Sequence, residues 1–179
     1  MLDGARERRQ GYDRDKFGDW IDADGDCLDT REEVLVAESR VGTGGGECEV
    51  TRGRWRSYYD RATWTDPGDV DIDHLVPLAE AWDSGARRWN PPTRHRYAND
   101  LGDRRALVAV TDNVNQSKGD QDIFEWRPEF GKCRYVAEWV AVKIRWSLRV
   151  DRQERRAMRH IASGCRNVRI TVAKAHIGT

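Results

Sequence analysis

Apolar and polar residues alternate most clearly in the segment 70–78, which reads Val-Asp-Ile-Asp-His-Leu-Val-Pro-Leu. Because side chains alternate across a strand, this pattern predicts a strand with an apolar face and a face that carries Asp71 and Asp73. His74 follows directly, and Pro77 ends the run. Unpaired buried charge is expensive, so these polar groups indicate either a binding site or the capping of a following helix.

A second apolar run, Leu-Val-Ala-Val at 107–110, predicts another short strand. A polar segment at 111–120 follows and reads as a turn that enters a short helix carrying Asn115 and Lys118. The order strand, insertion, strand and helix therefore brings a second set of polar side chains next to the first.

Helical spacing of apolar residues predicts further helices on both sides of these strands. The predicted helices cover about 30–40, 77–84, 133–149 and 151–163. In the third, an apolar stripe at i, i+4, i+7 and i+11 indicates core packing. Two weaker patterns predict a hairpin, with strands 47–51 and 54–57, and a short last strand at 168–172.

The size and charge of the chain limit its class. At 179 residues we expect one domain, with an N-terminal unit at 1–69, the paired polar segments at 70–126 and a helical part at 127–179. Charged residues make up 35% of the chain but cancel to a net charge of zero, so any polyanion would have to bind a local basic path. No apolar run approaches ~20 residues, and we expect no membrane partner.

The polar segments resemble the HNH, or ββα-metal, endonuclease superfamily, and most closely the secreted actinobacterial HNH nucleases. The matching stretches are Asp71 to Leu78, Trp82 with Ser84 and Gly85, Tyr97 to Asp100, Val110 to Asp120, and Trp126 to Pro128. The resemblance implies an α+β fold with a ββα-metal core: a short two-stranded hairpin plus a helix, surrounded by further helices and stapled by disulfides.

The resemblance also implies roles for individual residues. Asp73 and Asn115 would hold one divalent metal, His74 would be the general base, and Lys118 would be a catalytic or phosphate-contacting residue. The chemistry agrees, because hard oxygen donors suit Mg²⁺ or Mn²⁺ and an imidazole can take a proton from water. The final His of a full His-Asn-His pattern is absent near Asn115. Supporting residues, each with a local structural role as its alternative, are Asp71, Asn99, Asp100 and Asp120.

Arginines crowd the insertion between the two strands and are interleaved with aromatic residues. They predict a phosphate-tracking path, with an ordinary solvated face as the alternative. These arginines are Arg87, Arg88, Arg94, Arg96, Arg104 and Arg105.

The four cysteines have no Cys-x-x-Cys spacing, which disfavours a zinc knuckle. The resembled nucleases are secreted, so we pair Cys27 with Cys48 and Cys133 with Cys165, one of three possible connectivities. Four free thiols in a cytosolic protein are the alternative. Residues 1–6 open into charge and show no signal peptide, so secretion would require an earlier leader or another route.

Asp22, Asp24, Asp26 and Glu33 occupy positions one, three, five and twelve of an EF-hand-like loop and could bind Ca²⁺. Position six is Cys27 rather than glycine, which favours a plain polar loop tied by that cysteine.

The residues and the resemblance together predict a secreted, monomeric HNH-type endonuclease that uses one Mg²⁺ or Mn²⁺ ion. It would cut DNA, or RNA as an alternative, with little sequence specificity and leave 5′-phosphate and 3′-hydroxyl ends. The alternatives are a secreted, non-catalytic calcium-binding module on the same fold, and an intracellular nuclease with the same chemistry.

Overall fold

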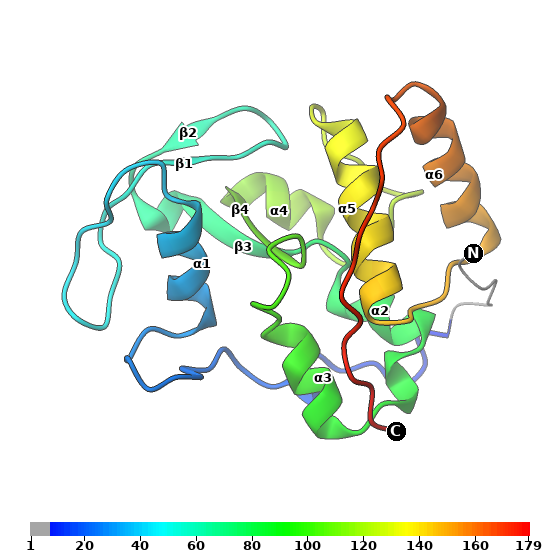
Figure 1. Cartoon of the computed structure of the whole chain (residues 1–179), viewed down its shortest axis with the longest axis horizontal. Helices are drawn as coiled ribbons and strands as arrows, with labels where there is room; N and C mark the ends of the chain where they lie inside the picture. Colours follow the sequence, from blue (N-terminus) through cyan, green and yellow to red (C-terminus); the bar gives the residue numbers. More distant parts are fainter. Residues whose placement is uncertain (1–7) are drawn as a thin grey trace.

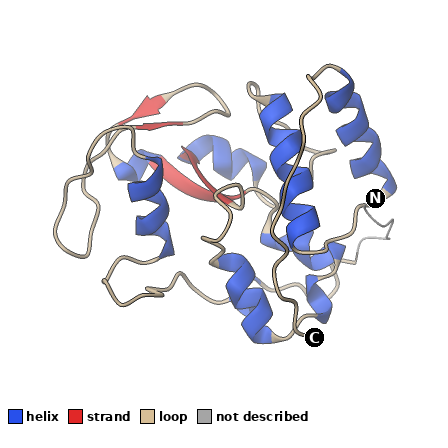
Figure 2. Cartoon of the chain, viewed as in Figure 1, coloured by secondary structure: helices blue, strands red, loops and turns tan. Residues whose placement is uncertain are grey.

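The protein is a mixed α+β structure in which helices and loops predominate over two small antiparallel sheets (Figures 1 and 2). The computed structural model describes residues 8–179, so the charged segment 1–6 lies outside the described residues. The α-helices are α1 (Thr30–Glu38), α2 (Leu78–Ser84), α3 (Pro91–Ala98), α4 (Asp112–Lys118), α5 (Lys132–Arg145) and α6 (Arg152–Ser163). The strands are β1 (Trp55–Arg56), β2 (Thr63–Trp64), β3 (Val70–His74) and β4 (Leu107–Thr111). Short 3-10 helices are η1 (Arg14–Phe17), η2 (Pro67–Asp69) and η3 (Ala86–Arg88).

The predicted strand pair is present. β3 and β4 are antiparallel, with Asp73 opposite Val108 and His74 opposite Leu107. β4 passes directly into α4, which packs against both strands. The hairpin crosses the middle of the molecule, with α1 on one side and α5 on the other (Figure 1). The order β3, β4, α4 therefore brings the two polar segments together.

The four predicted helices form with boundaries close to those expected, as α1, α2, α5 and α6. Local capping explains where they begin. The Asp29 side chain accepts from the Glu32 N–H at the start of α1, and Asp151 with Glu154 forms a complete capping box on α6. No helix within residues 8–179 is long and apolar enough to cross a membrane.

Two predicted elements are wrong. The hairpin is not at 47–57: β1 pairs with β2, and the turn between them contains Arg61 at a positive φ of 66°. In the loop before β1, the ladder pairing is a single isolated bridge between Gly44 and Arg52. The stretch 168–172 forms no strand, because it does not pair with a neighbouring strand. A side chain binds its backbone instead, since Arg105 donates to the Thr171 carbonyl at 3.0 Å.

Aromatic side chains fill the core between the hairpin and the C-terminal helices. Trp55, Tyr59, Tyr135, Trp139 and Trp146 are almost completely buried. This confirms that the apolar stripe of the third predicted helix packs in the core. Five of the eight tryptophans are buried, and the others, Trp20, Trp64 and Trp126, pack partly buried against the cluster.

Both predicted disulfides are present. Cys27 bonds Cys48 at 2.02 Å, and Cys133 bonds Cys165 at 1.97 Å. The first ties the acidic loop to the segment before β1, and the second joins α5 to the end of α6. Two such bonds fit an oxidising, extracellular environment.

A buried charge cluster joins α2, α5 and α6. The ammonium of Lys143, which is fully buried, forms an ion pair with Glu154 at 2.9 Å and another with Glu80. It also donates to Ser84 Oγ at 2.5 Å and to the Arg149 carbonyl at 2.9 Å. Burial raises the pKa of the Glu154 carboxyl to about 7. The single ammonium of Lys143 compensates the charge of two desolvated carboxyl groups, those of Glu80 and Glu154.

We expect Lys143→Met to lower the free energy of unfolding by about 3–5 kcal/mol at pH 8, because it leaves two buried carboxylates without their cation. Urea denaturation monitored by tryptophan fluorescence measures this loss. Lys132→Met, at an exposed position of the same helix, is the matched control and should change stability little. A loss below about 1 kcal/mol for Lys143→Met would contradict the account of this cluster.

Candidate active site

The candidate site lies where the end of β3 meets α4. β4 and α4 are continuous, so Asn115 and Lys118, which are three residues apart, face β3 from the same side of the helix. Gly119 ends α4 with a φ of 51°, in the left-handed region that glycine tolerates. The Lys-Gly pair of the sequence thus places a lysine at the last position of the helix that faces the strand.

A buried ion pair fixes α4 to β3. Lys118 Nζ lies 2.6 and 2.7 Å from the two carboxylate oxygens of Asp73 and donates to the His74 carbonyl at 2.9 Å. Tyr59 donates its hydroxyl to the same carboxylate. Lys118 is completely buried and Asp73 is 5% exposed. Lys118 therefore fixes α4 to β3, and its buried ammonium is not exposed to a phosphate in solvent.

Burial acts on the two charges of this pair in the direction that favours their neutral forms. It raises the pKa of the Asp73 carboxyl and lowers the pKa of the Lys118 ammonium. The attraction between them opposes both shifts. Burying either charge alone would be strongly unfavourable in free energy, so each charged form depends on the other.

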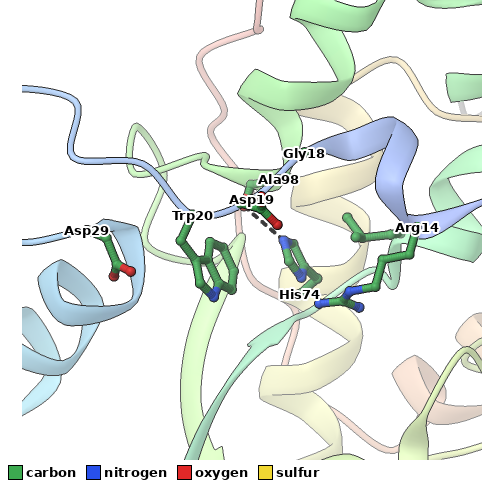
Figure 3. A pocket seen from close by; sticks show the side chains of 8 residues that line it. Arg14, Gly18, Asp19, Trp20, Asp29, His74 and Ala98 are labelled. Carbon is green, nitrogen blue, oxygen red and sulfur yellow. Dashed lines mark hydrogen bonds between the residues drawn. The ribbon is translucent and has the colours of Figure 1, made fainter.

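His74 is held in one orientation. Its Nε2 lies 2.9 Å from the Ala98 carbonyl oxygen, which can only accept, so we assign the proton to Nε2. Nδ1 then carries the lone pair. The ring lies nearly parallel to Trp20, at 9° and a centroid distance of 5.0 Å, and to Tyr97, at 14° and 6.4 Å. Figure 3 shows His74 beside Trp20, with the dashed hydrogen bond to Ala98.

Burial keeps this imidazole neutral. It lowers the pKa of His74 to about 3, and the nearby cations Arg14 and Lys118 act in the same direction. The hydrogen bond to Ala98 acts against them. The free nitrogen can accept a proton from water, although a pKa lowered in this way makes it a weaker base than a free imidazole.

Two small cavities meet at His74. One, of about 230 Å³, is lined by Arg14, Trp20 and Asp29, and the other, of about 180 Å³, by Asp73 and Asn115; His74 lines both. Arg14 also lines both cavities and points its guanidinium toward His74 from η1 (Figure 3). Within residues 8–179 it has no carboxylate within 4 Å. Its charge is therefore available to an anion in the site.

The second cavity presents oxygen donors suited to a hard cation. Asp73 and Asn115 both line it, and Asn115 uses its Nδ2 to donate to Asp71 at 3.2 Å, which leaves its amide oxygen outside that bond. These donors fit Mg²⁺ or Mn²⁺, with the remaining positions left for waters and phosphate oxygens. Among the described residues, no three acidic, His or Cys side chains converge at this point.

The predicted supporting residues divide into two groups. Asp71 and Asp120 lie near the cavity: Asp71 contacts Asn115, and Asp120 lines the wall. Asn99 and Asp100 have structural partners instead. Asn99 caps α3 and accepts from the Ile21 N–H at 3.2 Å, while Asp100 accepts from Arg145 and Trp146. These contacts agree with the alternative interpretation, in which Asn99 and Asp100 have a local structural role.

The six predicted arginines do not form one path. Arg94 and Arg96 donate to backbone carbonyls, Arg105 pairs with Asp103 at 2.6 Å, and Arg87 donates to the Asp83 carbonyl. Arg88 and Arg104 are exposed and, within the described residues, form no ion pair. Most of this charge is therefore used to hold loops and the C-terminal segment.

The acidic loop before α1 is compact. Ligand atoms of Asp22, Asp24 and Asp26 lie within 4.8 Å of one another. Cys27, at the position where an EF-hand has glycine, adopts a φ of 70°. Burial and these three carboxylates raise the pKa of Glu33. Calcium binding here stays a prediction.

Three contributors to the site were not predicted as site residues. Tyr59 comes from the segment after β1, and Arg14 and Trp20 come from the segment before the acidic loop. No sequence signal singled out Arg14 and Trp20, because they lie more than 50 residues from His74 in the sequence.

Comparison with known proteins identifies the family. Residues 33–161, most of the chain, match the model of the GmrSD restriction endonucleases, C-terminal domain. The chain belongs to this family. β3, β4 and α4 all lie inside the match, whereas Arg14 and Trp20 precede it. Membership in the GmrSD C-terminal domain family supports a nuclease-type function.

One curated relative extends the similarity to nearly the whole chain. A protein of Arthroderma benhamiae, described as an uncharacterized secreted protein, is 44% identical over 171 residues, which cover 92% of this chain and 83% of the relative. No solved structure matches the chain. The similarity to a protein described as secreted agrees with the two disulfides.

In this GmrSD-type domain, we expect the His74 ring not to titrate between pH 5 and 8. Its folded pKa is lower than that of a free imidazole, so it stays neutral until the pH falls toward 3. The stabilisation from burying the neutral ring is then present above about pH 6.5 and lost as the pH falls toward 3.

NMR measurement of the ring Cε1–H shift against pH tests this, with the resonance assigned by its loss in His74→Gln. A titration midpoint near the value of a free imidazole would contradict the geometry.

Proposed function

We propose that the protein is a secreted endonuclease of the HNH type, with a ββα-metal site formed by β3, β4 and α4. It would hydrolyse phosphodiester bonds of DNA with a single Mg²⁺ or Mn²⁺ ion, and RNA is the alternative substrate. The observation that carries this proposal is the position of His74, whose Nε2 is held by the Ala98 carbonyl in a cavity that His74 shares with Asp73, Asn115 and Arg14.

His74 Nδ1 accepts a proton from a water molecule as that water attacks the phosphorus. The bond from phosphorus to the 3′-oxygen breaks, and this oxygen leaves and takes up a proton from solvent water, while the proton on His74 returns to solvent. The products carry a 5′-phosphate and a 3′-hydroxyl. The Ala98 carbonyl keeps the proton on Nε2, and so holds the lone pair at the nitrogen that acts.

A divalent ion held by Asp73 and Asn115 would supply charge stabilisation to the phosphate oxygens and the leaving oxygen. Lys118 and Tyr59 position the Asp73 carboxylate, each by a hydrogen bond. Arg14 would bind a phosphate oxygen on the other side of His74, because among residues 8–179 no carboxylate pairs with its guanidinium.

We expect His74→Ala to lower the rate of supercoiled plasmid cleavage in Mg²⁺ or Mn²⁺ at least about 100-fold, because proton transfer by a positioned base contributes about 10²–10⁴. His74→Gln tests the same point with a side chain closer in size. His160→Ala, at an exposed position, is the control. Near-wild-type cleavage by a folded His74 variant would refute the role of this residue as the base.

We expect Asn115→Ala to raise the Mg²⁺ concentration for half-maximal cleavage at least about tenfold, since it removes one metal donor. Asn113→Ala, at an exposed position of the same helix, is the matched control. An unchanged metal titration for Asn115→Ala would count against Asn115 as a ligand.

A further inference from the structure

A groove of about 710 Å³ lies between α5, α6 and the C-terminal segment, away from His74. The C-terminal segment runs alongside α5 (Figure 1), held where the Ala175 N–H donates to the Arg145 carbonyl at 2.9 Å. Five solvent-accessible cations line the groove, and no acidic side chain does: Arg88, Arg149, Arg155, Arg159 and Lys174. We call these five residues the basic rim.

The charges of the basic rim are not used inside the protein. Across residues 8–179, none of the five has a carboxylate within 4 Å. This contrasts with Arg94, Arg96 and Arg105, which hold loops. Arg88 and Arg149 of the rim also lie near Arg87, because they act with burial to lower the pKa of its guanidinium.

The floor of the groove is apolar but well packed. Leu148, Val150 and Met158 are 2%, 1% and 8% exposed. The exposed large apolar side chains of the described part of the chain, such as Val36, Leu101 and Phe124, lie elsewhere. A lipid or an apolar peptide would therefore find little surface to bury, whereas a polyanion would find five free cations.

The groove is one short helix away from the candidate site. Leu78, at the start of α2, lines both cavities beside His74, and Ser84, at its end, accepts from the Arg149 N–H at 3.0 Å. Seven helical residues extend about 10 Å, and duplex DNA carries one charge per about 1.7 Å of axis. One turn of duplex DNA is longer than α2, so a duplex held at His74 could also reach the groove.

We propose that the basic rim binds the phosphate backbone of duplex DNA outside the cleaved bond. This inference rests on the proposed function, and it assigns duplex binding mainly to the C-terminal helices, with Arg88 as the one rim residue from the insertion between β3 and β4. The groove would supply sequence-independent affinity, and His74 would supply the chemistry.

The experiment compares two pairs of substitutions on α6. Arg155→Gln with Arg159→Gln removes two charges from the basic rim. Arg152→Gln with Arg156→Gln removes two exposed charges, at the same spacing on the same helix, that do not line the groove. Binding of a fluorescein-labelled 30-base-pair duplex is measured in EDTA against salt concentration, so the result does not depend on catalysis.

We expect the first pair to reduce the slope of log K against log salt by roughly 1.8, which corresponds to two lost phosphate contacts. The control pair should leave the slope unchanged. Equal effects of the two pairs, no change for the first, or binding of the wild type only to anionic vesicles would overturn the proposal.

A second measurement separates the groove from the chemistry. Hydrolysis of bis(p-nitrophenyl) phosphate, which is too small to reach the groove, should be unchanged in the Arg155→Gln, Arg159→Gln variant, while KM for plasmid rises. If the protein hydrolyses neither substrate but binds duplex DNA through the basic rim, the proposed role of the groove is supported and the proposed nuclease function is refuted. A fall in bis(p-nitrophenyl) phosphate hydrolysis in this variant would refute the separation of binding from chemistry.

Discussion

The buried ion pair between Asp73 and Lys118 is the interaction on which the candidate site depends. It crosses from β3 to α4 and, through the Lys118 bond to the His74 carbonyl, fixes the backbone that carries the proposed base. Burying an unpaired charge at this depth is costly in free energy, so β3 and α4 must lie where Asp73 and Lys118 can pair. The ion pair therefore specifies the geometry of strand and helix as well as stabilising it. Tyr59 adds a third element, because it reaches the same carboxylate from the segment after β1.

A second buried lysine serves the helical half in a similar way. Lys143 joins α2, α5 and α6 through Glu80 and Glu154, and α2 begins at the cavities beside His74. Two fully buried lysines therefore set the positions of the elements around the site. A protein with zero net charge can still concentrate its remaining cations locally, since much of its charge is paired internally.

Sequence patterns predicted the elements whose signals are local. Strict alternation identified β3, a short apolar run identified β4, and helical spacing identified α1, α5 and α6. The hairpin at 47–57 was misplaced because the pairing of β1 with β2 depends on a left-handed turn at Arg61, which no residue preference announces. The segment 168–172 looked like a strand because it is β-branched, but nothing in its sequence shows that Arg105 binds it.

The site was predicted in part, for the same reason. The resemblance to the HNH nucleases grouped Asp73, His74, Asn115 and Lys118, and the structure brings these residues together. The partners of each residue could not be read from spacing. Lys118 was expected at a phosphate and lies on Asp73, and the Ala98 carbonyl, Arg14 and Trp20 reach His74 only through the tertiary fold.

The central claim is that hard oxygen donors beside His74 hold the catalytic metal. The most direct measurement is anomalous diffraction from crystals of the His74→Ala variant grown with Mn²⁺. The account predicts one anomalous peak within bonding distance of oxygens of Asp73 and Asn115. A peak confined to the Asp22, Asp24 and Asp26 loop, or no peak with Asp73 still held only by Lys118 and Tyr59, would contradict it.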